Sequence, residues 1–290
     1  MRAAAIFGLG SSPSELRPFR EGSPTEWSEG VPASASGADA VLIFGGDGTI
    51  HRHLPALERL GLPILTVPVG SGNDFARALG LRSIRDAVRV WRTFEAGEIR
   101  ARAIDLGVIR PRGEPERGRY FCCVAGCGLD SATAELANKM PRWLRGHGGY
   151  VAALLPTLLR FPPFLLTVKT VNGAEHTENS RLTLLAAFAN TPYYGDGMRI
   201  APDADPADGK LDVCRIAALS PVKLFCMFPT VYFGGHRSMH EVEYSQAEHV
   251  CLETDRPLPV YADGEFVCET PVEIGVKSGG LLVIAPRNSG

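Results

Sequence analysis

The sequence predicts an α/β domain built on a parallel sheet, followed by a β-rich domain with an antiparallel, sandwich-like sheet. In the first part of the chain, apolar segments of strand length alternate with amphipathic helical segments, and two of these strands end in glycine-rich polar loops. Beyond Gly97, strands separated by turns predominate. A chain of 290 residues suffices for two domains of ordinary size. We therefore expect an α/β domain over residues 1–97 and a β-rich domain over residues 98–290, whose last strand can pack back on the first domain.

The composition is that of a folded protein without a strong overall charge. Hydrophobic residues make up 45% of the chain, and 30 basic against 32 acidic residues leave a net charge of -2. This balance argues against a nucleic-acid partner and against attraction to membranes by bulk charge. No segment reaches the roughly 20 apolar residues of a membrane-spanning helix, and the N-terminal apolar run is too short for a secretory signal. We therefore expect a cytoplasmic protein, in which any membrane contact is local.

The seven cysteines are expected to be reduced and mostly buried. Their number is odd, and the only close set is Cys122, Cys123 and Cys127. This set lacks the CxxC or histidine spacing that a zinc site requires.

The elements of the first domain follow from apolar periodicity. Residues 40–44 are continuously apolar and form the central strand. Residues 50–60 form a helix, because Ile50 and three leucines fall on one face, and Gly61 can end it. The other expected elements are strands over residues 3–7 and 63–69, helices over residues 14–19, 75–79 and 83–94, and a long loop or one short strand over residues 20–37.

The central strand stops in a glycine loop that surrounds one carboxylate. Glycine has no Cβ, so the main-chain N–H groups of Gly45, Gly46 and Gly48 can approach an anion closely. Asp47 can hold Mg²⁺ through water, and the Thr49 hydroxyl can cap the following helix or touch phosphate. The loop therefore predicts a phosphate site, although turn chemistry alone also permits a simple tight connection.

A second glycine loop follows the next strand and contains Gly70, Ser71, Gly72, Asn73 and Asp74. The strand, helix and strand form a βαβ unit, whose right-handed crossover makes the two strands parallel. Both loops then leave the same edge of the sheet. Ligands of open α/β sheets bind outside the carboxyl ends of the strands, so the two loops are expected to line one crevice.

The β-rich half contains two candidate clusters of carboxylates. Asp263 and Glu265 flank one glycine, which indicates either a plain hairpin turn or a general base or metal ligand. Four aspartates in a separate cluster could hold a hard cation, but the placement of the glycine and the lack of a closing glutamate exclude an EF-hand calcium loop. The cluster comprises Asp203, Asp205, Asp208 and Asp212. The expected elements are strands over residues 102–109, 120–125, 164–170, 181–189, 249–253, 258–261, 272–276 and 281–284, and helices over residues 131–140 and 221–228.

Residues 139–147 combine Trp143 with several cations, and residues 154–164 nearby are largely apolar. Tryptophan and arginine suit the headgroup boundary of a bilayer, so the two segments can form a membrane-facing lip. The same pattern also suits helices that close over a β core.

The glycine loops and the Asp263 turn, taken together and in this order, resemble the diacylglycerol kinase catalytic-domain family, to which bacterial soluble lipid kinases and sphingosine kinases belong. The likeness runs from about Asp39 to the C-terminus. It implies a two-domain kinase that uses ATP and Mg²⁺, in which ATP lies beside the glycine loops. The lipid would enter from the β-rich domain, with peripheral contact to the inner membrane surface. The expected product is a phosphorylated diacylglycerol or a related lipid.

The resemblance also implies roles for particular residues. Phosphates and Mg²⁺ would be held by the first loop, from Gly46 to Thr49, and the nucleotide would lie along the second loop at Ser71 and Asn73. Asp263 would take the proton of the lipid hydroxyl, a role that Glu265 can share. Asp208 matches the position of a structural magnesium ion.

Two other functions stay open at the level of the sequence. Family members usually carry an Asn-Pro turn after the first strand, whereas this chain has Gly8 to Ser12 there and a short stretch before Gly45. This departure leaves room for a nonenzymatic lipid-binding relative with an incomplete nucleotide site. NAD kinase shares the first glycine loop, but its second loop is unlike Gly70 to Arg77.

Overall fold

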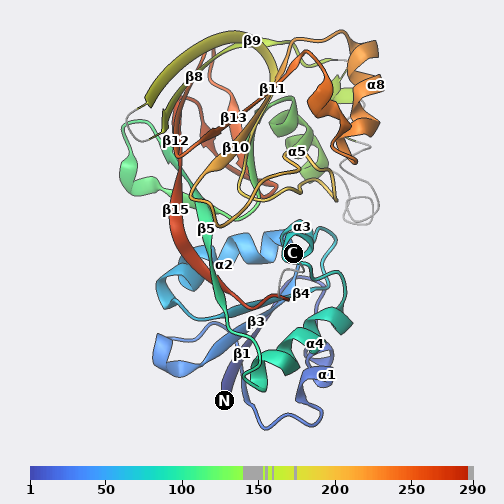
Figure 1. The fold of residues 1–290 in the computed structure, drawn as a ribbon, viewed down its shortest axis with the longest axis vertical. Coiled ribbons are helices and arrows are strands. Elements are labelled where there is room, and N and C mark those ends of the chain that lie inside the picture. The colour runs from blue at the N-terminus through green and yellow to red at the C-terminus, as the bar shows by residue number, and fades with distance from the viewer. Residues whose placement is uncertain (140–152, 154–155, 159, 173–174, 287–290) are drawn as a thin grey trace. The chain divides into compact units, whose positions relative to one another are not determined.

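The computed structural model describes residues 1–139, 153, 156–158, 160–172 and 175–286. The chain divides into two compact units, each described here by itself. Unit 1 comprises Met1–Asp105 together with Ser278–Gly290, and unit 2 comprises Leu106–Lys277. Figure 1 shows both, with unit 1 in blue to teal and red.

Unit 1 is built on the predicted parallel sheet. Its strand order is β2, β1, β3, β4 and then the end of β15, and the neighbouring strands run parallel. The last strand joins at Val283, which pairs with Ile64 of β4. The strands are β1 (Arg2–Phe7), β2 (Glu26–Glu29), β3 (Ala40–Gly45), β4 (Ile64–Pro68) and β15 (Val272–Val283).

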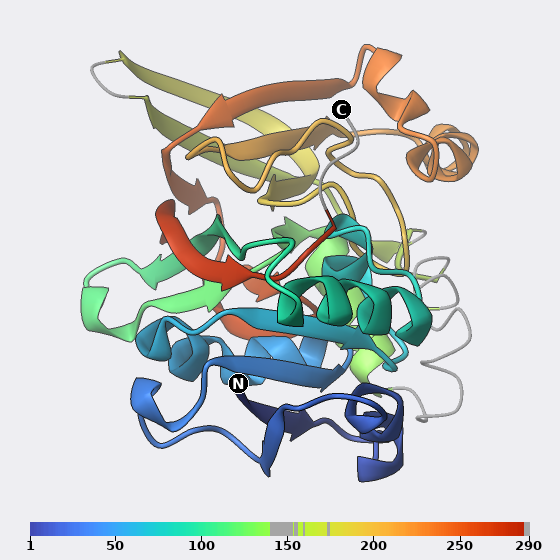
Figure 2. The same ribbon diagram turned by 60° about the horizontal axis from the view of Figure 1, so that its bottom comes forward.

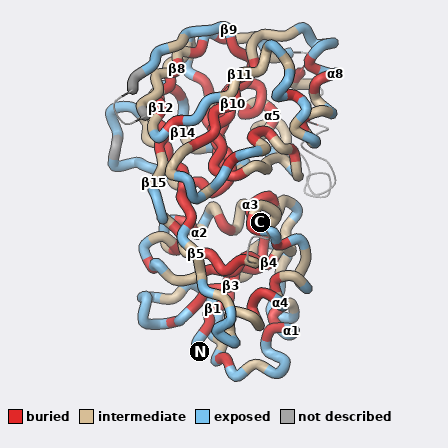
Figure 3. Tube along the Cα trace, in the orientation of Figure 1, coloured by how far each residue is buried: buried red, intermediate tan, exposed pale blue. Residues whose placement is uncertain are grey.

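Burial explains why the apolar runs of unit 1 form these elements. Every residue of β3 is buried, as expected for a central strand of a parallel sheet (Figure 3). Helix α2 (Asp47–Leu60) buries the predicted apolar face and ends at Gly61, which has a left-handed φ of 60°. It packs on β3, whereas α4 (Ile84–Glu95) packs on β4.

The remaining helices of unit 1 match the predicted positions within a few residues. Ser83 caps α4 by accepting the N–H of Asp86. The buried residues of α4 are Ala87, Val90 and Trp91. The short helices are α1 (Arg17–Arg20) and α3 (Asp74–Ala78).

Unit 2 is the predicted antiparallel β-rich domain. The strand order is β14, β13, β7, β9, β8, β12 and the first part of β15, and β10 and β11 extend from β9 (Figure 2). The strands are β5 (Arg102–Pro111, shared with unit 1), β6 (Arg119–Phe121), β7 (Val124–Gly128), β8 (Phe164–Asn172), β9 (Glu175–Ala189), β10 (Leu211–Ala217), β11 (Val242–Ala247), β12 (His249–Thr254), β13 (Pro259–Ala262) and β14 (Glu265–Glu269).

Three details of unit 2 differ from the sequence prediction. The strand expected over residues 120–125 is broken at Cys122 and Cys123, which separate β6 from β7. The strands expected over residues 272–276 and 281–284 are one strand, β15. Strands β11 and β14 were not predicted, because their charged and exposed residues hide the alternation of apolar side chains, and β10 was not predicted, because its buried residues mix apolar with charged side chains.

Two helices cover part of the sheet of unit 2, namely α5 (Leu129–Lys139) and α8 (Pro221–Val231). Helix α8 begins at the cap residue Ser220 and carries Pro221 at its first position. Residues 140–147, 154, 155 and 159 of the predicted membrane-facing lip, among them Trp143, lie outside the described residues. Among the helices that are described, none combines the length and the apolar character needed to span a membrane.

Candidate active site

The two glycine loops of unit 1 pack directly on each other through their backbones. A Cβ atom added to Gly46 would lie 2.2 Å from the carbonyl oxygen of Gly72, and one added to Gly70 would lie 2.3 Å from the nitrogen of Gly46. The N–H of Asp47 donates to the Gly72 carbonyl at 3.0 Å. The glycines are therefore required for contact between the loops, in addition to any approach of an anion.

Asp47 connects the two loops. Its Oδ2 accepts the N–H of Asp74 at 2.9 Å, and its Oδ1 accepts the N–H of Phe75 at 3.0 Å. These two N–H groups begin α3, so the carboxylate satisfies donors that a helix leaves unpaired at its start. The fixed position of Asp47 thus comes from capping a helix that follows the second loop.

Thr49 lies in the first turn of α2, whose N-cap residue is Gly46. The expectation that Thr49 caps this helix is therefore wrong, because the helix begins at Asp47, three residues earlier than the apolar pattern indicated. The Thr49 side chain instead fills the space over Gly8 and Gly45, where an added Cβ would lie 2.1 and 2.5 Å from its Oγ1. This contact brings the Gly8 turn to the same edge of the sheet.

The Asn73 side chain closes the second loop on itself. Its Nδ2 donates to the Gly70 carbonyl at 2.7 Å, and its Oδ1 accepts the Gly70 N–H at 3.2 Å. Ser71, by contrast, is exposed. The structure thus brings together the predicted residues of both loops, and it gives Asn73 a role in shaping the loop.

Asp263 of unit 2 is held by three successive backbone N–H groups. The carboxylate accepts the N–H groups of Cys122, Cys123 and Val124 at 2.9, 2.8 and 3.3 Å, and the Cys122 thiol donates to its Oδ2 at 3.3 Å. These donors explain the bend between β6 and β7, because the backbone turns its N–H groups toward the carboxylate. Asp263 itself has a left-handed φ of 49°, which aspartate tolerates better than most residues.

Asn190 supports this bend from the other side. Its side-chain Nδ2 donates to the Cys122 carbonyl at 3.0 Å, and its backbone N–H donates to the Cys123 carbonyl at 2.8 Å. Glu265, in contrast, is exposed at the start of β14. Asp263 is therefore built into a hydrogen-bonded site, while Glu265 lies on the surface of the hairpin.

The aspartate cluster of unit 2 lies around the start of β10. The Gln246 amide donates to Asp208 Oδ2 at 3.3 Å and to Asp212 Oδ2 at 3.4 Å. Burial raises the pKa of Asp212, and the charges of Asp208 and Asp203 raise it further, while the Gln246 hydrogen bond opposes the shift. The carboxylates thus repel one another, as expected where a cation can be accommodated.

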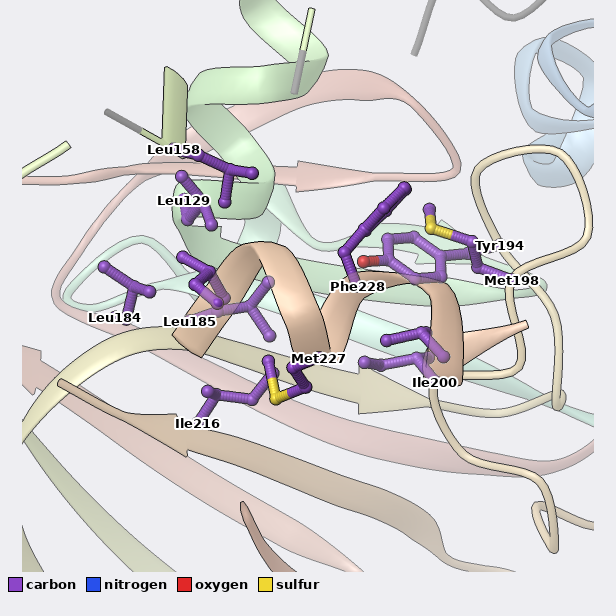
Figure 4. Close-up of a pocket in the computed structure, with 12 residues that line it drawn as sticks. Leu129, Leu158, Leu184, Leu185, Tyr194, Met198, Ile200, Ile216, Met227 and Phe228 are labelled. Carbon is purple, nitrogen blue, oxygen red and sulfur yellow. The ribbon is translucent and has the colours of Figure 1, made fainter. Parts of the chain in front are cut away.

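A narrow apolar pocket lies under α8 in unit 2. The space inside it that a water molecule can reach is about 30 Å³, so its own side chains nearly fill it. Figure 4 shows Phe228 of α8 near Tyr194, whose hydroxyl is a polar atom among apolar walls, and Met227 on the side of Ile216. The lining residues are Leu129, Leu158, Leu184, Leu185, Tyr194, Met198, Ile200, Ile216, Leu224, Met227, Phe228 and Val231.

Comparisons with known proteins identify the family. A model of the diacylglycerol kinase catalytic domain matches residues 20–109, and a model of the YegS C-terminal NAD kinase beta sandwich-like domain matches residues 123–285. A diacylglycerol kinase of Mycobacterium tuberculosis is 36% identical over 256 residues, which cover 88% of this chain and 80% of that protein. The chain therefore belongs to the diacylglycerol kinase catalytic-domain family. This is a family of lipid kinases, which take a phosphoryl group from a nucleotide.

Solved structures share the fold. Crystal structures of a diacylglycerol kinase from Bacillus anthracis give TM-scores of 0.76 and 0.68 at 20% and 17% identity, each covering 99% of this chain and 97% of that chain. An NAD kinase from Archaeoglobus fulgidus in complex with ATP gives a TM-score of 0.55 at 14% identity, over 99% of this chain and 94% of that chain. At these identities the likeness concerns the fold alone, and it confirms the predicted fold class.

Three contributions to the site were missed at the level of the sequence. Cys122 and Cys123 were expected only as small buried residues, and no role was assigned to Asn190. These residues are brought together from distant parts of the sequence. Cys122 and Asp263 are 141 positions apart, and Asn190 and Cys122 are 68 positions apart. The break in the apolar run at two adjacent cysteines is a weak signal that could have indicated the bend.

Proposed function

We propose that this protein is an ATP-dependent lipid kinase that phosphorylates the hydroxyl group of diacylglycerol or a related lipid. The observation that carries the proposal is the apolar pocket of unit 2, in a chain whose family is one of lipid kinases. Twelve side chains line this pocket, and all but Tyr194 are apolar, which suits an acyl chain.

The glycine loops support the nucleotide half of the proposal. The N-terminus of α2 begins at the first loop, and helix N-termini favour phosphate groups. Gly46 and Gly48 are partly exposed there, whereas Gly45 is buried. Asp47 would act mainly by holding the loops in register, and it would reach Mg²⁺ only through water, since each of its oxygens already accepts a helix N–H.

Asp263 is the proposed general base. A carboxylate offers about four lone-pair positions, and the Asp263 carboxylate accepts three N–H groups and one thiol. The thiol is the weakest of these donors, so the lipid hydroxyl would take its place at Oδ2 and give up its proton there. Glu265 is the second candidate for the base, but it is exposed at the start of β14.

Asp208 is the proposed ligand of a structural magnesium ion. Its carboxylate lies near Asp212, whose pKa is raised first by burial and then by the charges of Asp208 and Asp203, although Arg237, which pairs with Asp203, opposes the shift. Carboxylate and carbonyl oxygens are the ligands that Mg²⁺ prefers. The ion would therefore relieve repulsion at the start of β10.

Helix α8 is the proposed membrane contact. Its inner face lines the pocket, while its outer face carries Val222 and Phe225, which are 75% and 60% exposed, followed by Phe233 at 84%. No acidic residue occurs from Val213 to His240, so an anionic bilayer would not repel this surface. A helix that is apolar on both faces suits a site where a bound lipid contacts the inner face and the bilayer contacts the outer face. Phe225→Asp should weaken sedimentation with anionic vesicles, and unchanged sedimentation would contradict this contact.

The test of the kinase proposal compares two tryptophan substitutions on the same helix. Met227→Trp would fill the pocket, whereas Phe225→Trp changes only the exposed face. With ATP, Mg²⁺ and diacylglycerol in mixed micelles, the wild type and Phe225→Trp should transfer γ-phosphate to the lipid. Met227→Trp should raise the KM for the lipid about tenfold or more while leaving ATP binding intact, because a mismatch of even one methylene in an apolar pocket is worth roughly 10 to 200-fold.

The alternatives give different results in this assay. Phosphate transfer to NAD instead of lipid would select the NAD kinase function. Lipid binding without transfer to any lipid hydroxyl would select the nonenzymatic relative. Equal lipid KM values for the wild type and Met227→Trp would contradict the assignment of the pocket.

A further inference from the structure

Two adjacent thiols lie beside the Asp263 carboxylate in unit 2. The Sγ atoms of Cys122 and Cys123 are 4.0 Å apart, and Cys122 Sγ is 3.3 Å from Asp263 Oδ2. Neighbouring side chains of a regular strand point to opposite faces. The bend between β6 and β7 removes this alternation, so both thiols approach the same carboxylate.

These three groups have the dimensions of a tetrahedral metal site. One ligand atom from each lies within 4.8 Å of the other two. Metal bonds of about 2.3 Å to sulfur and about 2.1 Å to oxygen place two tetrahedral sulfurs about 3.8 Å apart, and a sulfur and an oxygen about 3.6 Å apart. The separation of 4.0 Å between the two sulfurs and that of 3.3 Å between Cys122 Sγ and Asp263 Oδ2 differ from these by a few tenths of an ångström, and the Cys123 sulfur lies within 4.8 Å of the carboxylate.

The chemistry of the three ligands favours a soft divalent cation. Two thiolates and one carboxylate suit Zn²⁺ or Cd²⁺ and are unsuited to Mg²⁺, which prefers oxygen. Both thiols are buried, while Asp263 is partly exposed and offers a path of entry. The three N–H groups that donate to the carboxylate favour negative charge at the site.

We infer that Cys122, Cys123 and Asp263 form a binding site for a soft divalent metal ion such as Zn²⁺. The metal would replace the hydrogen bond between the Cys122 thiol and Asp263 Oδ2, and two thiol protons would leave to solvent. A fourth position would remain for water. Among the described residues, no other set of three cysteine, histidine or carboxylate groups reaches this proximity.

The site would also regulate the enzyme, and this consequence rests on the proposed function. The metal and the lipid hydroxyl would compete for Oδ2 of Asp263, so the bound metal would block the base. Metal binding itself does not depend on kinase activity. A binding experiment without nucleotide or lipid therefore separates failure of this site from failure of the kinase proposal.

The experiment titrates the full chain, reduced and freed of metal, with Cd²⁺ and follows the thiolate-to-metal charge-transfer band in the ultraviolet. We expect one Cd²⁺ per chain and release of two protons. Zn²⁺ affinity is measured by competition with a chromophoric chelator. Cys122→Ser and Cys123→Ser should each lower the Zn²⁺ affinity at least about tenfold. Asp263→Asn should lower the affinity by a similar factor but keep the charge-transfer band, because both thiolates remain.

The matched control is Cys226→Ser, because Cys226 is exposed on α8. This variant should bind the metal as the wild type does. A wild-type chain without the band, a band lost in Cys226→Ser, or full affinity in both Cys122→Ser and Cys123→Ser would overturn the site. Melting curves show whether each variant is folded. If Cys122→Ser does not fold, Cys122→Ala is tested in its place.

Discussion

Two aspartates, one in each unit, are held by backbone N–H groups, but the structures around them differ. Asp47 accepts two N–H groups that begin helix α3, and the loops around it contain glycines in direct contact. Asp263 accepts three N–H groups of a bend between two strands, together with a thiol. The comparison indicates that Asp47 mainly assembles its site, whereas Asp263 has a weakly bound position at which another group can enter.

The largest expected effect concerns the contact between the glycine loops. Gly46→Ala should destabilise the protein by more than about 3 kcal/mol, because the added Cβ would meet backbone atoms that cannot move independently. Urea unfolding followed by circular dichroism measures the change. Gly37→Ala is the control, since its Cβ would make an ordinary contact 3.5 Å from Pro32. Equal stability of the two variants would show that the loops do not depend on this close approach.

The next effect compares the two aspartates directly. Asp263→Ala should lower the free energy of unfolding more than Asp47→Ala, by about 2 to 4 against about 1 to 3 kcal/mol. The alanine at position 263 leaves three N–H groups without their acceptor and occupies a left-handed backbone, while the alanine at position 47 leaves two. Asp263→Asn should recover part of the loss, because asparagine accepts a hydrogen bond and tolerates this φ. The opposite order of the two alanine variants would contradict the comparison.

The smallest expected effect concerns the aspartate cluster of unit 2. Millimolar Mg²⁺ should raise the melting temperature of the wild type by a few degrees, since a ligand that binds only the folded state stabilises it. Asp208→Ala should remove this dependence on magnesium. Asp255→Ala, at an exposed site away from the cluster, is the control. Asp196→Ala would not serve, because the backbone of Asp196 is left-handed. A melting temperature that does not change with Mg²⁺ in the wild type would count against the ion.

Most of the fold could be predicted from the sequence, because its signals are local. The apolar runs of β3 and β4 and the glycines after them indicated a parallel βαβ unit, and the structure has that unit. The glycine loops were recognisable for the same reason. Strand β10 was missed, because its pairing with β9 and β11 buries residues whose local pattern is mixed.

The surroundings of Asp263 could not be predicted, because they depend on contacts between distant parts of the chain. Cys122 lies 141 positions from Asp263 in the sequence. A carboxylate beside a glycine indicated a turn or a base, but nothing near it in the sequence pointed to the cysteines. The apolar pocket under α8 is likewise assembled from α5, β9, β10 and α8, so its existence follows from packing and not from any one motif.

The proposed role of Asp263 as the base of a lipid kinase can be tested by phosphate transfer. Labelled γ-phosphate transfer from ATP to diacylglycerol is measured for the wild type and Asp263→Asn, with ATP binding measured alongside. The wild type should transfer phosphate to the lipid, and Asp263→Asn should do so at least about a hundredfold more slowly while still binding ATP. Transfer at the wild-type rate by Asp263→Asn would contradict the role of Asp263 as the base. No transfer to any lipid hydroxyl by the wild type would contradict the lipid kinase function.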